Sequence, residues 1–214
     1  MHKKKLIFLV VIALLLCGCT KIGNDLDVIV NTVFTDNKTV VNTASTNYEL
    51  YIPTNVKQES DSEYNQKFKI ADRYVYLYVD TISYYYKNSL NYKGEDNYNY
   101  YFKKINYNGK DGYVGIDKMD DGLYFTEIVY NYSKIEFYSD YENLPTIFAN
   151  SLIIIKSIKY NDNLIKMALD SGYNDSREVK YQLDSPKDSE SKFSDFLQEY
   201  VPEETEEVTL PEEE

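Results

Sequence analysis

The sequence predicts an α+β domain in which an antiparallel meander of strands carries helices on one face. Two observations indicate this class. Runs of alternating residues rich in Tyr, Val, Ile and Phe, several of them separated by glycine-containing turns, occupy residues 48–138. A helical repeat of apolar residues follows from residue 144. Strands first and helices afterwards are typical of α+β proteins, whereas α/β folds alternate the two.

The predicted strands follow one another closely. Residues 48–52 end at Pro53, as a first or edge strand does. Residues 73–79 (RYVYLYV) alternate, so we expect the tyrosines on one face and the aliphatic side chains on the other. Further strands are predicted over residues 98–107, 113–119, 123–130 and 133–138, with turns at residues 108–112 and 121–122.

The period changes after residue 143. Apolar or small side chains recur at helical spacing at Leu144, Ile147, Phe148, Ser151, Leu152 and Ile155. Pro145 fits this helix because it falls in the first turn. Beyond it we expect a short strand at 157–160, a short helix at 163–170, an alternating segment at 178–183 and a helix at 189–200.

These elements place the α+β domain at residues 47–200, and the segments around it have other compositions. Residues 1–18 read as a signal peptide. Residues 19–46 are rich in Asn, Thr, Asp and Val without helical periodicity, so we expect a lipidated N-terminus and flexible spacer whose apolar residues could dock on the domain. Residues 201–214 hold seven glutamates and no basic residue, and we expect a disordered acidic tail.

The N-terminus resembles a bacterial lipoprotein signal. A basic stretch, MHKKK, precedes eleven apolar residues from Leu6 to Leu16, too few to span a bilayer but typical of a secretory signal. The following Leu-Cys-Gly-Cys resembles the lipobox, although Cys17 stands where Ala, Ser or Thr is more usual. The resemblance implies cleavage between Gly18 and Cys19 and lipidation of Cys19. The alternative is an uncleaved signal anchor.

Cleavage at this position would decide the chemistry of the mature chain. It would leave 20 basic against 35 acidic residues, a net charge of about −15, and remove His2, the only histidine. Without histidine or a free thiol, His-based triads, Cys nucleophiles and His/Cys zinc sites are excluded. The acidic, Arg-poor composition also argues against nucleic-acid binding. With no nucleotide-binding motif, we expect no cofactor.

Tyrosine is unusually frequent, with 24 residues in the chain, 18 of them between Tyr64 and Tyr141. Tyrosine is common at recognition surfaces. The chain is also rich in Asn, Lys and Ile, the pattern that an AT-rich genome produces. The enrichment alone therefore does not establish a binding face.

Acidic residues supply the remaining candidate sites. Asp117, Asp120 and Asp121 surround a predicted hairpin tip but lack the spacing of a calcium loop, as does the segment from Asp170 to Asp175, so we expect solvated turns and no metal.

Glu127 and Glu136 could serve as the two carboxylates of a glycosidase. Among 35 acidic residues, nothing in the sequence selects this pair. For Lys134, we expect cross-strand pairing rather than a Schiff base.

The order of elements resembles the PsbP-like fold. The resemblance covers residues 48–160 and is carried by the strand before Pro53, the meander, YNYSKIEFY, the long helix and SIKYN. The family includes an extrinsic photosystem II subunit, a nuclear-import release factor and small bacterial lipoproteins. It implies binding rather than catalysis, and it supplies no catalytic motif.

The expected function is therefore that of a non-enzymatic lipoprotein on the extracytoplasmic face of a bacterial cell membrane. Its domain would bind a protein or cell-wall component of the envelope. The alternatives are a carboxylate-based hydrolase of envelope glycans, and a small-ligand carrier with an apolar pocket between helix and sheet.

Overall fold

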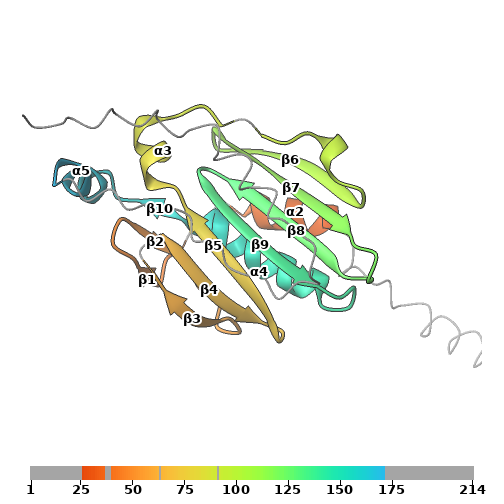
Figure 1. Ribbon diagram of the computed structural model, residues 1–214. Coiled ribbons are helices and arrows are strands. Elements are labelled where there is room, and N and C mark those ends of the chain that lie inside the picture. Colours follow the sequence, from red (N-terminus) through yellow and green to blue (C-terminus); the bar gives the residue numbers. More distant parts are fainter. Residues whose placement is uncertain (1–25, 37–39, 63, 91, 172–214) are drawn as a thin grey trace, which may run out of the picture. The chain divides into compact units, whose positions relative to one another are not determined.

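The computed structural model describes residues 26–36, 40–62, 64–90 and 92–171 (Figure 1). All described residues belong to one unit of the chain, which lies within Met1–Leu183. The helices are α2 (Leu26–Thr35), α3 (Thr81–Tyr86), the 3-10 helix η2 (Glu95–Asn97), α4 (Leu144–Ser157) and α5 (Asp162–Asp170). The strands are β1 (Thr43–Ala44), β2 (Tyr48–Leu50), β3 (Lys57–Asp61), β4 (Asn65–Ile70), β5 (Arg73–Val79), β6 (Tyr101–Tyr107), β7 (Lys110–Lys118), β8 (Tyr124–Tyr130), β9 (Ser133–Ser139) and β10 (Lys159–Tyr160). This confirms the predicted α+β class.

Seven strands form one antiparallel sheet in the order β3-β4-β5-β9-β8-β7-β6. The β6–β7 hairpin turns over only two residues, Asn108 and Gly109, whose φ angles of 51° and 70° match a type I′ turn. The turn is thus shorter than the five residues expected, because β7 already begins at Lys110. Gly122, with a φ of 85°, lies in the next turn.

Helix α4 covers one face of this sheet and supplies the centre of the core (Figure 1). Its Ile147, Phe148 and Leu152 are fully buried, as the spacing of apolar residues predicts. The strands contribute their inward-facing side chains, among them Phe68, Val75, Leu77, Val79, Ile128, Ile135 and Phe137. The aliphatic residues of β5 therefore lie on the core face, as expected.

A smaller sheet has the order β1-β2-β10. In it, β2 pairs with β10, so the strand before Pro53 meets the strand that follows the long helix. The hydroxyl of Ser157, at the end of α4, accepts a hydrogen bond of 2.7 Å from the backbone N–H of Tyr51. These contacts join the segment before Pro53 to the end of α4 and to the strand that follows it.

Helix α2 corrects one expectation. Residues 19–46 were expected to form a flexible spacer, but Leu26–Thr35 is an α-helix that packs on α4. Leu26, Val30 and Phe34 are buried in the core because they recur every four residues on one side of the helix. The flexible-spacer prediction is therefore wrong for these ten residues and for Thr43–Ala44, which form β1. The docking on the domain that the sequence allowed for the apolar residues of this segment is confirmed.

The other differences lie in elements that the sequence pattern did not indicate. Strands β3 and β4 form a charged hairpin with an irregular register between Gln58 and Ser60. Helix α3 follows β5 directly, and its first turn is capped by Asp80, whose side chain accepts a bond of 2.8 Å from the N–H of Ser83. None of the described helices is long and apolar enough to cross a bilayer. The elements predicted at 178–183 and 189–200 and the tail at 201–214 lie outside the described residues.

Candidate functional site

The sheet has a second face, opposite α4, which we call the polar face. It carries the side chains that alternate with the core residues: Tyr76, Tyr78, Tyr113, Phe125, Glu127, Lys134, Glu136 and Tyr138. Glu127 of β8 lies directly opposite Glu136 of β9 in the register. The two acids proposed from the sequence are thus brought together, on neighbouring strands in the middle of the sheet.

Glu127 is completely buried and is held by three side chains. Lys93 Nζ lies 3.2 Å from both Oε1 and Oε2. The hydroxyl of Tyr113 donates to Oε1 at 2.5 Å, and the hydroxyl of Tyr98 donates to the same oxygen. We call Glu127, Lys93, Tyr98 and Tyr113 the Glu127 cluster.

Two members of the Glu127 cluster come from the segment between α3 and β6. The ring of Tyr98 lies over Gly115 of β7, where an added Cβ would approach the ring to 2.2 Å. Glycine at position 115 is therefore what lets Tyr98 reach Glu127. Nearby, the hydroxyl of Tyr92 donates to the carbonyl of Asp111 at 3.0 Å. Together these contacts fasten the segment to the sheet.

The electrostatics of the cluster favour an ionised Glu127. Burial raises the pKa of its carboxyl, but the charges of Lys93 and Lys134 and the two tyrosine hydrogen bonds outweigh burial and leave the pKa below its usual value. Burial and the neighbouring Glu127 charge raise the pKa of Tyr98 and of Tyr113, so both hydroxyls stay protonated as donors.

Glu136 also has a lysine beside it. Lys134, two residues earlier on β9, places Nζ 3.1 Å from Oε1 of Glu136, and both side chains are nearly buried. In the register Lys134 lies opposite Tyr78 and Val129. A glycosidase needs one carboxyl with a raised pKa as general acid. The lowered pKa of Glu127 does not suit that role.

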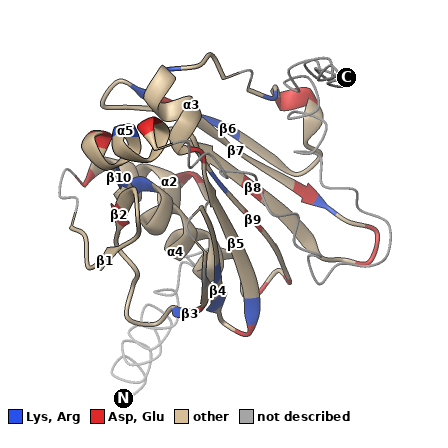
Figure 2. Ribbon diagram, turned by 60° about the vertical axis from the view of Figure 1, so that its left-hand side comes forward, with Lys and Arg blue, Asp and Glu red and all other residues tan. Residues whose placement is uncertain are grey.

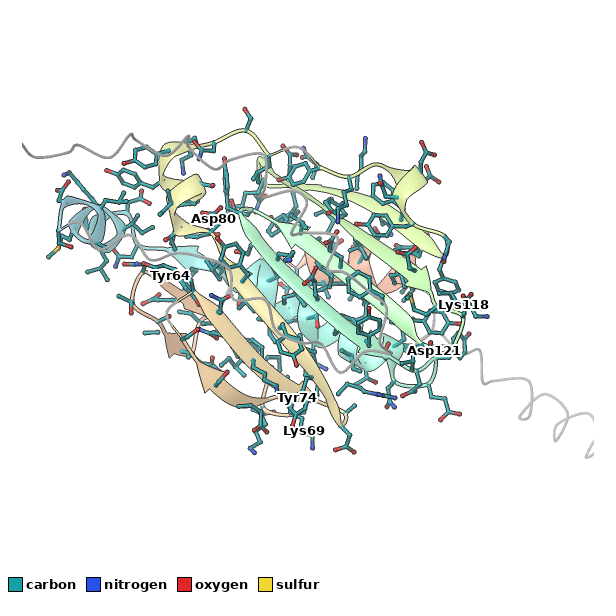
Figure 3. All side chains as sticks on the ribbon, in the orientation of Figure 1. Tyr64, Lys69, Tyr74, Asp80, Lys118 and Asp121 are labelled. Atoms are coloured by element: carbon teal, nitrogen blue, oxygen red, sulfur yellow. The ribbon has the colours of Figure 1, made fainter. Side chains whose placement is uncertain are left out.

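The aspartates considered as calcium ligands have other roles. Asp117 Oδ1 accepts a bond of 2.9 Å from the N–H of Asn99, and Asp121 Oδ1 accepts one of 2.9 Å from the N–H of Leu123. Figure 3 shows Asp121 in the turn after β7, far from Asp80. Asp170 pairs with Lys166 at the end of α5. Within the described ranges, no group of three His, Cys, Asp or Glu could hold a metal.

Three large apolar side chains are exposed on α3 and α5, and the sequence pattern did not indicate them. The two helices pack side by side (Figures 1 and 2). Tyr86 is 61% exposed, Met167 66% and Leu164 41%. We call these three residues the α3–α5 patch. The only sequence signal was the placement of Leu164 and Met167 away from the inward-facing Ile165.

The aromatic packing beneath the patch fixes α3. Tyr84 stacks on Tyr160 of β10 with ring centroids 3.7 Å apart, and it meets Tyr132 edge to face at 5.9 Å. The ammonium of Lys87 lies 3.4 Å from the centre of the Tyr84 ring. The patch is therefore displayed on a helix that is anchored to the domain.

The fold defines a mixed α+β protein whose large antiparallel sheet has α4 on one face and a buried ionic cluster on the other. Compared with protein families, curated proteins and solved structures, the chain matches none.

Proposed function

We propose that this chain is a non-enzymatic lipoprotein, cleaved after Gly18 and anchored by lipidated Cys19 on the extracytoplasmic face of a bacterial cell membrane. Its domain binds a protein or wall component of the envelope. The lipobox resemblance supports the anchor. A strand before Pro53, a meander, a long helix and a closing strand support a PsbP-like assignment of the domain.

The observation that carries the binding proposal is the α3–α5 patch. Tyrosine and methionine are enriched at protein interfaces, and exposed apolar side chains that gather on adjacent elements mark interaction sites. Tyr86 on α3 and Leu164 and Met167 on α5 are exposed on two helices that pack against each other. Because their chemistry suits an apolar protein surface better than a polar glycan, the proposal favours a protein partner.

A carboxylate-based hydrolase of envelope glycans is the second candidate, and one observation favours it. Glu127 and Glu136 are cross-strand neighbours, a placement that puts Cβ atoms about 4.5–5.5 Å apart. Against it, each acid is buried beside a lysine, and Glu127 has a lowered pKa. This arrangement supports fastening of the segment before β6 more than proton transfer.

A photocrosslinking amino acid at position 167 in intact cells tests the binding proposal. If the α3–α5 patch binds a protein partner, we expect one discrete protein adduct, which mass spectrometry would identify. Position 141 is the control, because Tyr141 is 52% exposed and follows the end of β9, whereas the patch lies near the beginning of that strand. Adducts that are the same from both positions, or none from position 167, would contradict the proposal. Labelled wall fragments in place of protein would move the assignment toward glycan binding.

A further inference from the structure

The N-terminal side of helix α2 is fixed to the sheet by polar contacts. Lys103 of β6 places Nζ 2.6 Å from Asp27 Oδ1 and 3.0 Å from Asn31 Oδ1. The hydroxyl of Tyr101 donates to the same Asp27 oxygen at 3.0 Å. The hydrogen bond from Lys103 lowers the pKa of Asp27, so the carboxylate stays ionised. The first turns of α2 are thus held by β6.

The other end of α2 is fixed from α4. Lys156 donates from Nζ to the carbonyl of Val33 at 2.5 Å and to the carbonyl of Asp36. A cation at these C-terminal carbonyls also interacts favourably with the helix dipole. Phe34 of α2 is also buried, and its ring packs edge to face on the rings of Tyr107 and Tyr130, with ring centroids 5.8 and 5.0 Å apart. Helix α2 is therefore part of the folded domain.

This attachment shortens the tether that an anchor at Cys19 would provide. Only residues 20–25 lie between Cys19 and Leu26. At 3.3–3.6 Å per residue, they reach no more than about 25 Å, whatever conformation they adopt. A tether that ran to β1 at Thr43 would have more than three times as many residues.

We infer that α2 holds the domain at the bilayer surface, so that its partner is the extracytoplasmic part of a membrane-embedded protein rather than distant wall material. This inference rests on the proposed lipid anchor. The lipid surface itself is a poor partner, because a mature chain with a net charge of about −15 is repelled by anionic headgroups. A membrane-embedded protein is within reach and can present an apolar contact.

The reach is tested with the full-length lipidated protein in vesicles of phosphatidylglycerol and phosphatidylethanolamine containing a rhodamine-labelled lipid as acceptor. A donor dye is placed at the exposed position 104 through Lys104→Cys. Energy transfer should fall when 40 Gly/Ser residues are inserted after Gly23. It should fall by a smaller amount in the double variant Lys103→Met and Lys156→Met, which releases α2 from the domain. Lys118→Met, which removes an exposed lysine from β7, should leave transfer unchanged. Transfer in the unaltered chain as low as in the linker variant would overturn the short tether.

The partner class is tested by crosslinking from position 167 with the same 40-residue insertion. Effective concentration falls roughly as the −3/2 power of tether length, and the insertion lengthens the tether from 6 to 46 residues. The yield of a membrane-protein adduct should therefore fall about 20-fold. A yield that stays constant or rises, adducts to wall material or lipid, or no adduct at all would overturn the membrane-partner assignment. Fractionation of the Cys19→Ala variant separates failure of the lipid anchor from failure of the membrane-partner assignment. If this variant stays in the membrane fraction, the anchor itself is refuted.

Discussion

Replacing Glu127 by Ala is expected to lower the free energy of unfolding by about 3–5 kcal/mol, the usual cost of removing one partner of a buried ion pair. The substitution deprives Lys93, which is only 15% exposed, of its carboxylate. It also takes the acceptor from the hydroxyls of Tyr98 and Tyr113. Urea denaturation followed by circular dichroism measures the change. A loss below 1 kcal/mol would show that the Glu127 cluster does not hold the fold.

Matched variants separate the cluster from general effects of substitution. Glu95→Gln removes an exposed acid from the same segment and should change stability by less than about 0.5 kcal/mol. Gly115→Ala should cost about 1–3 kcal/mol, because the new methyl group displaces the Tyr98 ring. Gly94→Ala is its control, since nothing lies within 4 Å of a Cβ there. Glu127→Leu combined with Lys93→Met should recover much of the loss, because no buried charge is left without its partner.

The protein is expected to unfold more easily as the pH rises from 10 to 12. Among the residues that the structure describes, eight tyrosines have raised pKa values: Tyr84, Tyr92, Tyr98, Tyr100, Tyr113, Tyr130, Tyr132 and Tyr160. Burial is the main cause in each, and it raises the pKa of Tyr92 and of Tyr130 to about 12. In the unfolded chain these hydroxyls ionise near pH 10, whereas in the folded domain each needs a higher pH to ionise.

The sign follows from proton linkage. Above pH 10 the folded state binds more protons than the unfolded state, so stability is fully present below that pH and decreases as the pH rises through the folded pKa values. Denaturant midpoints measured at pH 8, 10 and 11.5, with tyrosinate absorbance on the same samples, test this. A midpoint at pH 11.5 equal to that at pH 8, with tyrosinate already formed in the folded protein, would contradict the raised pKa values of these tyrosines.

Much of the fold could be predicted because its signals are local. The alternation in residues 73–79 placed Val75, Leu77 and Val79 on the core face, and the spacing from Leu144 to Ile155 identified α4. Helix α2 was missed because its apolar residues recur only every fourth position among β-branched neighbours, which are weak helix formers. Packing on α4 stabilises a helix that propensity alone does not favour.

The Glu127 cluster could be predicted only in part, for a different reason. The sequence named Glu127 and Glu136 as a possible pair of carboxylates but did not select them among the other acids, and the register of β8 and β9 brings them together. Lys93 and Tyr98, however, lie 34 and 29 residues away from Glu127, in a segment without regular periodicity. The contact between Tyr98 and Glu127 depends on the close approach of the Tyr98 ring to Gly115. A contact of this kind between distant residues cannot be predicted from a local sequence pattern. The α3–α5 patch likewise depends on packing between distant helices.

The cluster and the patch are connected through one segment. The chain leaves α3 at Lys87 and then supplies Lys93 and Tyr98 to Glu127. Tyr132, which precedes β9, donates to the carbonyl of Asn88 at 3.1 Å. The buried ionic contacts thus help to hold the segment that follows the helix presenting Tyr86.

Mass spectrometry of the mature N-terminus tests the central claim, that the domain is held at the membrane through Cys19. The proposal predicts that the protein purified from bacterial membranes begins at Cys19, that this residue carries diacylglycerol, and that no peptide contains Cys17. A mature chain that keeps residues 1–18, or one that begins at another residue without lipid, would contradict the anchor and, with it, the short tether through α2.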